Sequence, residues 1–172
     1  MSTIIESLEE MAQNESKVRA ILKRSLAFDP GLYPPAFPYV EYRLTSTDGN
    51  WKRTVYYLVA GLWALNWREN QGVAQQSLPE ACRMLYDGKD KSPSIEKRFI
   101  ALLDVDETQL AHRLRQMISL LKDYAIDFNL LLEDLLSWKH PDKFVQIKWA
   151  KIFYQTETLL DNEPENNLEE KQ

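Results

Sequence analysis

The sequence predicts an all-α fold with two lobes. Apolar residues recur at three- and four-residue spacing in most segments, the period of one face of a helix. The 172 residues include only five glycines, and alternating segments rich in turns are scarce, which argues against a sandwich or a barrel. We expect an N-terminal helical lobe over residues 1–90, a C-terminal helical bundle over 91–160 and an acidic, disordered tail over 161–172.

The first part of the N-terminal lobe is expected to contain one long helix or two abutting helices over residues 3–27. The apolar stripe changes near Gln13 and Asn14, where two helices would be offset. Four prolines between residues 30 and 38 predict a loop, because proline interrupts regular helices. Residues 39–44 are compatible with an extended segment or with a short helix, and both remain open.

Two further helices are expected in this lobe. The segment from Trp51 to about Asn66, capped by Asn50, is apolar on nearly every side, which indicates a central helix. Residues 68–76 are predicted to form an exposed loop. Ser77 then begins a helix that ends near Gly88, with Pro79 in its first turn and Glu80 at the third position, the pattern of a capping box.

The C-terminal bundle is expected to follow the charged boundary at residues 87–91. One amphipathic helix begins at Ser92 or Ser94 and stops at the acidic break 104–107, and a second begins at Thr108 or a neighbour and reaches about Lys122. The remaining two helices extend from a cap at Asp127 to Trp138 and, after the break at 140–142, from about Val145 to Leu160.

Several protein classes are disfavoured by the sequence. A single cysteine, Cys82, cannot form an intramolecular disulfide, and the N-terminal residues lack the pattern of a secretory signal. The most apolar run, 55–65, is shorter than the about 20 residues that cross a membrane. We therefore expect a cytoplasmic protein that makes no membrane contact.

Catalytic and metal-binding patterns are missing. His112 and His140 have no carboxylates at ligand spacing, and there is no glycine-rich phosphate loop, nucleophile elbow or zinc-protease pair. The acidic pairs 104/106 and 133/134 are interpreted as helix caps and exposed helix faces. The sequence thus predicts no metal, no cofactor and no enzymatic activity.

The distribution of charge is the strongest functional signal from composition. The net charge is −5, yet residues 16–160 carry 17 acidic and 20 basic residues. Lysine and arginine point outward on the helices that contain Ile95, Leu110 and Val145. These charges form either an ordinary solvated surface or, if the helices are neighbours, one basic groove or ridge that would suit a phosphate backbone.

Five motifs resemble, in order and spacing, the CasB family, the small subunit of the type I-E Cascade complex. They are Ser94-Ile-Glu-Lys-Arg-Phe-Ile-Ala-Leu-Leu, Leu114-Arg-Gln with Ser119-Leu-Leu, Ile126-Asp-Phe, Asp134-Leu-Leu-Ser-Trp and Trp149-Ala-Lys-Ile-Phe-Tyr. The chain departs from the family pattern at Phe128, where tryptophan is common, at Pro79, where glycine is common, and at Lys151 and Ile152, where an Arg-Asp pair is frequent.

The resemblance implies a non-catalytic subunit that binds nucleic acid without sequence specificity. Its expected partners are crRNA, both target DNA strands of the R-loop, the backbone and large Cascade subunits, and a second copy of itself. The basic residues carried over from the family are Lys97, Arg98, Arg113, Arg115, Lys139 and Lys143; Lys122, Lys148, Lys151 and Arg53 are added from surface pattern alone.

Two other functions remain open at this stage. A helical scaffold that binds only proteins would use the basic faces to dock acidic partner surfaces. An enzyme with an unrecognised site would lose turnover when one particular acid or histidine is replaced.

Overall fold

The protein is built from helices in the ranges that its computed structural model describes, residues 2–67 and 75–154. No strand occurs in these ranges, and one isolated parallel bridge joins Gln76 to Ile126. The predicted all-α fold is therefore confirmed. The helices are α1 Ile4–Asn14, α2 Lys17–Ser25, α3 Phe37–Val40, α4 Asn50–Asn66, α5 Leu78–Gly88, α6 Pro93–Leu103, α7 Glu107–Leu120, α8 Phe128–Leu136 and α9 Phe144–Tyr154, with short 3-10 turns at Pro34–Ala36 and Glu41–Arg43.

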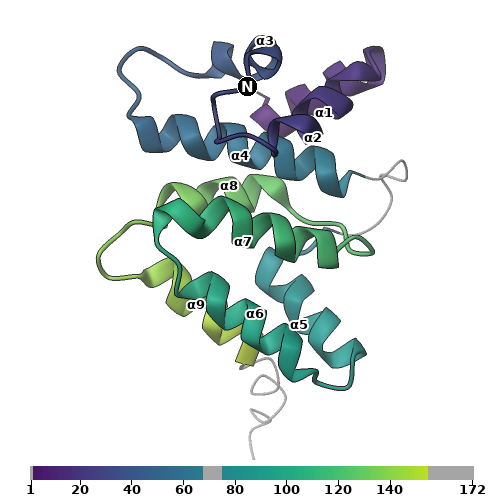
Figure 1. Ribbon diagram of the computed structural model, residues 1–172, viewed down its shortest axis with the longest axis vertical. Helices are drawn as coiled ribbons and strands as arrows, with labels where there is room; N and C mark the ends of the chain where they lie inside the picture. Colours follow the sequence, from purple (N-terminus) through teal and green to yellow (C-terminus); the bar gives the residue numbers. More distant parts are fainter. Residues whose placement is uncertain (1, 68–74, 155–172) are drawn as a thin grey trace, which may run out of the picture.

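The helices stack in tiers along the long axis of the molecule (Figure 1). The first tier contains α1, α2 and α3 with α4 beneath them, and the second tier contains α7 and α8, which pack against the other side of α4. The third tier contains α5, α6 and α9, and α6 contacts α7 above it. The division of the chain at residue 90 stays a prediction; α5, which precedes it, packs against α6 and α9, which follow it.

Helix α4 is the centre of the upper tiers, as its all-round apolar sequence predicts. From Tyr57 to Ala64 every residue is buried, because helices cover it on two sides. Gly61 lies where α2 crosses α4: a methyl group there would be 2.5 Å from Leu26 Cδ2. The predicted cap at Asn50 is wrong. Gly49 is the N-cap and Asn50 is the first residue of the helix, without a capping side-chain bond.

Other helix boundaries follow from their caps. The first segment forms two helices, α1 and α2, which end and begin on either side of Glu15 and Ser16. Ser77 and Glu80 form the predicted capping box of α5. The N-cap residues of α6, α7 and α8 are Ser92, Asp106 and Asp127, although the Ser92 side chain makes no capping bond.

The proline-rich segment is more regular than the predicted loop. It contains the 3-10 turn Pro34–Ala36 and the start of α3, with Pro38 in the first helical turn. Proline fits there because the first amides of a helix need no intrahelical partner. The open segment 39–44 completes α3 and continues into the second 3-10 turn. The predictions for residues 68–74, for the last helix beyond Tyr154 and for the tail lie outside the described residues.

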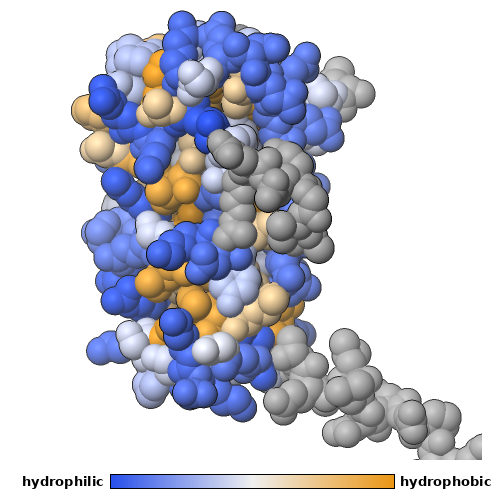
Figure 2. Space-filling model, turned by 90° about the vertical axis from the view of Figure 1, so that its right-hand side faces the viewer, coloured by the Kyte–Doolittle hydropathy of each residue, from blue (hydrophilic) through white to orange (hydrophobic). Residues whose placement is uncertain are grey.

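The surface is mostly hydrophilic, with a few apolar patches on the face shown in Figure 2. Within residues 2–67 and 75–154, no helix has the length and apolar character that a membrane crossing requires. The same ranges contain no group of three or more His, Cys, Asp or Glu side chains suited to a metal ion.

Candidate nucleic-acid interface

A row of three adjoining hollows follows α6 and α7 and reaches the end of α2. Neighbouring hollows share residues: His112 and Arg115 belong to the first two, and Arg98, Ser119 and Leu120 to the last two. We call this depression the α6–α7 groove. Its polar and charged lining side chains are Ser25, Asp29, Tyr57, Thr108, His112, Arg115, Gln116, Arg98, Ser119, Ser92, Ser94, Lys89, Lys122 and Asp123.

The positions of Arg98 and Arg115 follow from how their helices bury their apolar stripes. Helix α6 buries Ile95, Phe99 and Leu102, and Arg98 lies at the edge of that stripe, beside α7. Helix α7 buries Leu110, Leu114, Met117 and Ile118, which leaves Arg115 exposed on the groove side. The contact between α6 and α7 therefore brings two arginines from separate helices into one hollow.

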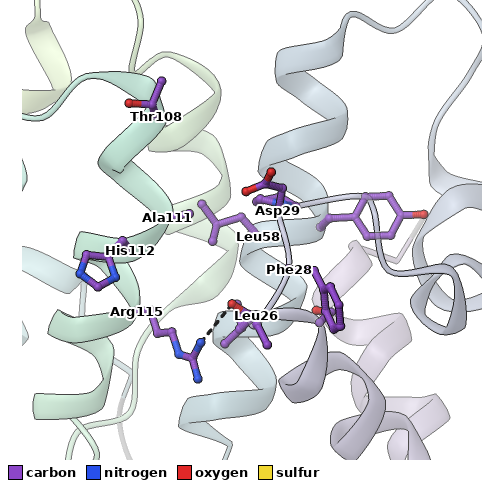
Figure 3. Close-up of a pocket in the computed structure, with 12 residues that line it drawn as sticks. Leu26, Phe28, Asp29, Leu58, Thr108, Ala111, His112 and Arg115 are labelled. Atoms are coloured by element: carbon purple, nitrogen blue, oxygen red, sulfur yellow. Dashed lines mark hydrogen bonds between the residues drawn. The ribbon is translucent and has the colours of Figure 1, made fainter.

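Arg115 is held in place by the end of α2. Its Nη1 donates a hydrogen bond to the carbonyl oxygen of Leu26, 3.0 Å away, as drawn in Figure 3. Leu26 is the C-cap of α2, where the helix dipole presents partial negative charge. The bond fixes a guanidinium where the first two hollows adjoin and uses one of its five N–H donors.

The groove carries an excess of positive charge. Lys89, Arg98, Arg115 and Lys122 line it, against two acids, Asp29 at the α2 end and Asp123 at the α5 end. A row of cations in a depression attracts the phosphates of a nucleic-acid backbone and releases condensed counterions. Contacts between these cations and phosphates carry no sequence information, so that part of the binding would depend little on sequence.

The structure places two of the predicted basic residues outside this lining. Lys97 is exposed on α6 but points away from the buried stripe, next to Arg98 in sequence and about 100° around the helix. Arg113 lies about 200° around α7 from Arg115, and thus on the other side of that helix. Its side chain is half-buried, and its Nε has no hydrogen-bond partner in the described part of the chain.

Arg53 and Lys139 have partners within the protein. Arg53 bonds to the Glu41 carboxylate and donates to the Gly31 carbonyl oxygen, 2.8 Å from Nη1. Lys139 lies 2.8 Å from the carboxylate of Glu107 and 5.1 Å above the ring of Trp51. Both therefore lie apart from the groove, in contacts that connect segments of the fold.

Lys148 is paired with Asp134, and this corrects the interpretation of Asp134 as a residue of an exposed helix face. Asp134 is buried in α8, where it accepts a hydrogen bond from Trp149 Nε1 at 2.8 Å and pairs with the Lys148 ammonium. A buried carboxylate needs such partners. The pair joins α8 to α9 and gives the partly exposed Lys148 ammonium a partner within the protein.

The last two predicted residues lie at α9. Lys143 is exposed, directly precedes the helix and has a left-handed backbone with φ of 51°. Lys151 is exposed on the helix face that also carries Phe144, Ile147 and Tyr154, which are each about half exposed. The ten predicted positions are thus divided: Arg98, Arg115 and Lys122 line the groove, and Lys97, Arg113, Lys139, Lys143, Lys148, Lys151 and Arg53 do not.

Sequence reasoning missed Lys89 and Phe28, which also line the groove. Lys89 lies in the charged segment 87–91, whose composition predicts only a boundary between the lobes. Phe28 is an aromatic residue between the end of α2 and the proline-rich segment, a position where exposure cannot be inferred from helical periodicity. Packing of distant segments, and not spacing along the chain, brings both into the groove.

The fold and the groove define the class: an all-α protein whose neighbouring helices form a cationic depression. Comparison with known proteins then identifies the family. Residues 18–154 match the family model of CRISPR-associated protein Cse2. A CRISPR-associated protein Cse2 from Thermus thermophilus is 45% identical over 139 residues, which cover 79% of this chain and 78% of the relative. The chain belongs to the Cse2 family, and the sequence resemblance to CasB is confirmed.

Solved structures agree with this assignment. A crystal structure of a Cse2-family protein from Thermus thermophilus is 41% identical with a TM-score of 0.78, covering 88% of this chain and 95% of that chain. The crystal structure of M. ruber CasB is 33% identical with a TM-score of 0.72, covering 93% and 97%. A chain of a CRISPR RNA-guided surveillance complex, at 20% identity and a TM-score of 0.73 over 92% and 97%, shares the fold.

Proposed function

We propose that this protein is a non-catalytic small subunit of a type I-E Cascade complex, which binds nucleic acid without sequence specificity. In this role it stabilises crRNA, target DNA and the displaced strand of the R-loop during antiviral defence. Its partners are the backbone and large subunits and a second copy of itself. The observation that carries the proposal is the α6–α7 groove, where Arg98 and Arg115 come together from two helices.

The energetics of strand exchange suit such a role. The heteroduplex formed in an R-loop is about as stable as the DNA duplex that it replaces, so modest contacts to the backbone tip the balance. Four cations along one depression can provide contacts of this kind. Family membership supports the proposal, because the related fold also occurs in a CRISPR RNA-guided surveillance complex.

The test is a salt titration of nucleic-acid binding by the full chain and by reconstituted Cascade. Arg98→Ala should weaken binding roughly fivefold to tenfold, because a charged hydrogen bond contributes roughly 1.5–3 kcal/mol before solvent exposure reduces it. The slope of log K against log salt should fall by about 0.7 on single strands and about 0.9 on duplex.

Lys17→Ala provides the matched control. Lys17 is also exposed and basic, but it lies at the N-terminal end of α2 beside Glu15, whereas the groove reaches the C-terminal end of α2. It should leave both affinity and slope unchanged. Equal slopes for wild type and Arg98→Ala, in the isolated chain and in the complex, would contradict the proposal.

A second function, docking to other proteins, is supported by the outer face of α9. Phe144, Ile147 and Tyr154 share one side of the helix and expose 45–50% of their surface. An apolar stripe of this kind is typical of a contact with another subunit. Ile147→Glu should then reduce incorporation into Cascade while it leaves the salt dependence of nucleic-acid binding unchanged; normal incorporation would exclude this face.

A further inference from the structure

Phe28 is an aromatic side chain that the fold holds at the surface. Half of the residue is exposed, 50%, while its ring stacks on Tyr33 with centroids 4.8 Å apart and planes 7° from parallel. Tyr33 is itself partly buried and packs against the core. Because Tyr33 covers one face of the Phe28 ring, a ligand could stack only on the opposite face.

The segment that carries Phe28 is fixed by hydrogen bonds. The amide of Phe28 donates to the Ser25 carbonyl oxygen at 3.1 Å, and the amide of Leu32 donates to the Asp29 carbonyl oxygen at 3.1 Å. Arg53 donates to the carbonyl oxygen of Gly31, whose φ of +86° suits glycine. The aromatic platform is therefore preorganised, and a ligand that stacks on it has little loop entropy to overcome.

Phe28 and Arg115 line the same hollow, on opposite walls (Figure 3). The wall after α2 carries Phe28 and Asp29, and the α7 wall carries Thr108, His112 and Arg115. The bond to Leu26 occupies one guanidinium donor of Arg115 and leaves others for an anion. An aromatic platform, a carboxylate and a guanidinium thus surround one small depression.

We propose that this hollow binds one unpaired nucleotide, with its base stacked on Phe28 and its phosphate against Arg115. This rests on the proposed function and specifies where a single strand enters the groove. A base has an accessible face for stacking only outside a duplex, so the site selects single-stranded over paired segments. Asp29 sets the orientation: its carboxylate repels phosphate and accepts hydrogen bonds from base N–H groups.

The test compares Phe28→Leu with wild type, as full-length chains, on three ligands: oligothymidylate, an abasic strand of equal length and a duplex. Stacking contributes about 1–3 kcal/mol per base. Phe28→Leu should therefore weaken oligothymidylate binding at least about fivefold and leave abasic-strand and duplex binding unchanged. Oligouridylate, used in parallel, distinguishes an RNA strand from a DNA strand as the ligand.

Tyr42→Leu is the matched control, because Tyr42 is 53% exposed but lies in the 3-10 turn Glu41–Arg43, outside the lining of the groove. It should change none of the affinities. The site is disproved if wild type binds base-bearing and abasic strands equally, or if Phe28→Leu weakens all three ligands alike. Salt-dependent binding without a base preference would disprove this site alone, whereas no binding of any strand, alone or in Cascade, would disprove the proposed function as well.

Discussion

Arg115 on α7 and Leu26 at the end of α2 are joined by a hydrogen bond of 3.0 Å from guanidinium to carbonyl. The contact links residues 89 positions apart and crosses between two tiers of the fold. Arg115 therefore has two roles: it supports the C-terminal end of α2, and it places a cation in the α6–α7 groove.

Arg115→Ala removes both contributions, and separate measurements of stability and of nucleic-acid affinity distinguish them. Arg115→Ala loses a solvent-exposed hydrogen bond and a charge at a helix C-terminus, which together contribute about 0.5–1 kcal/mol. The melting temperature should fall by roughly 1–4 °C in a thermal scan. Nucleic-acid affinity should fall in a separate anisotropy measurement on protein that is fully folded.

Gln116→Ala is the control for this change, because Gln116 lines the same groove without a charge. It should leave the melting temperature within about 1 °C of wild type. An unchanged melting temperature for Arg115→Ala would show that the Leu26 contact adds nothing to stability.

Gly61→Ala should destabilise the protein by about 1–3 kcal/mol, the usual range for an overpacked core. The added methyl group would lie 2.5 Å from Leu26 Cδ2 and 3.2 Å from the Leu22 carbonyl oxygen, so the Leu26 side chain must move and the backbone of α2 must yield slightly. Because Leu26 carries the carbonyl that Arg115 contacts, the groove should also be disturbed. Urea denaturation of Gly61→Ala measures the change in the free energy of unfolding.

Gly49→Ala offers the comparison for Gly61. A methyl group at Gly49 meets no atom within 4 Å, although glycine is the better N-cap residue. Gly49→Ala should lower the free energy of unfolding by less than about 1 kcal/mol. If both variants unfold at the same urea concentration, close packing of α2 on α4 is not what requires glycine at position 61.

The stability contributed by Asp106 should depend on pH. Its carboxylate accepts hydrogen bonds from the amides of Thr108 and Gln109 and from the Thr108 hydroxyl, at 3.0, 3.2 and 2.6 Å. The Thr108 hydroxyl, followed by these amides, holds the pKa of Asp106 below its ordinary value. Since the folded pKa is lowered, the stabilisation is complete above the ordinary pKa of about 3.9 and is lost as pH falls through the folded pKa.

Thermal scans of Asp106→Ala and wild type check this dependence. The variant should melt a few degrees lower at pH 7, and the difference should shrink when both are scanned at pH 3 and below. Asp106→Asn keeps a good N-cap acceptor that does not titrate in this range, so it should melt above Asp106→Ala at both pH values. A difference between wild type and Asp106→Ala that stays constant from pH 7 to pH 2 would disprove the titration of this cap.

Periodicity predicted the elements well because helix formation is local. The central position of α4 followed from its all-round apolar sequence, and the capping box of α5 from Ser77 and Glu80. The sequence predicts Asn50 as the cap of α4 because asparagine is a stronger N-cap residue than Gly49, which is the cap in the structure. The four prolines predict a loop, but Pro38 lies in a first helical turn, where it costs no hydrogen bond.

Local patterns predicted the candidate site less completely. The outward positions of Arg98 and Arg115 follow from the stripes of their own helices, yet the hollow that they share depends on how α6 packs on α7. Arg113 is only two residues from Arg115 in sequence, yet it lies about 200° around α7 from Arg115 and does not line the groove. The burial of Asp134 needs Trp149 and Lys148, which come from another helix, so its sequence neighbours gave no sign of it.

The contact between Asp134 and α9 leads to the last prediction. Asp134→Ala would leave the Trp149 indole N–H buried without an acceptor and would remove the partner of Lys148. An unsatisfied buried donor costs about 1–3 kcal/mol, and the lost side-chain volume adds to this. The free energy of unfolding should fall by roughly 2–4 kcal/mol in urea denaturation.

Lys148→Ala should be the milder change, because the Asp134 carboxylate keeps its bond to Trp149 and the lysine side chain is 45% exposed. We expect a loss of about 1–2 kcal/mol in the same urea titration, because the buried Asp134 carboxylate loses its cationic partner. Since Lys148 lies outside the groove, the salt slope of nucleic-acid binding should match wild type. A slope lowered by about 0.7–0.9 would instead show that Lys148 contacts phosphate and that its pairing with Asp134 is broken on binding.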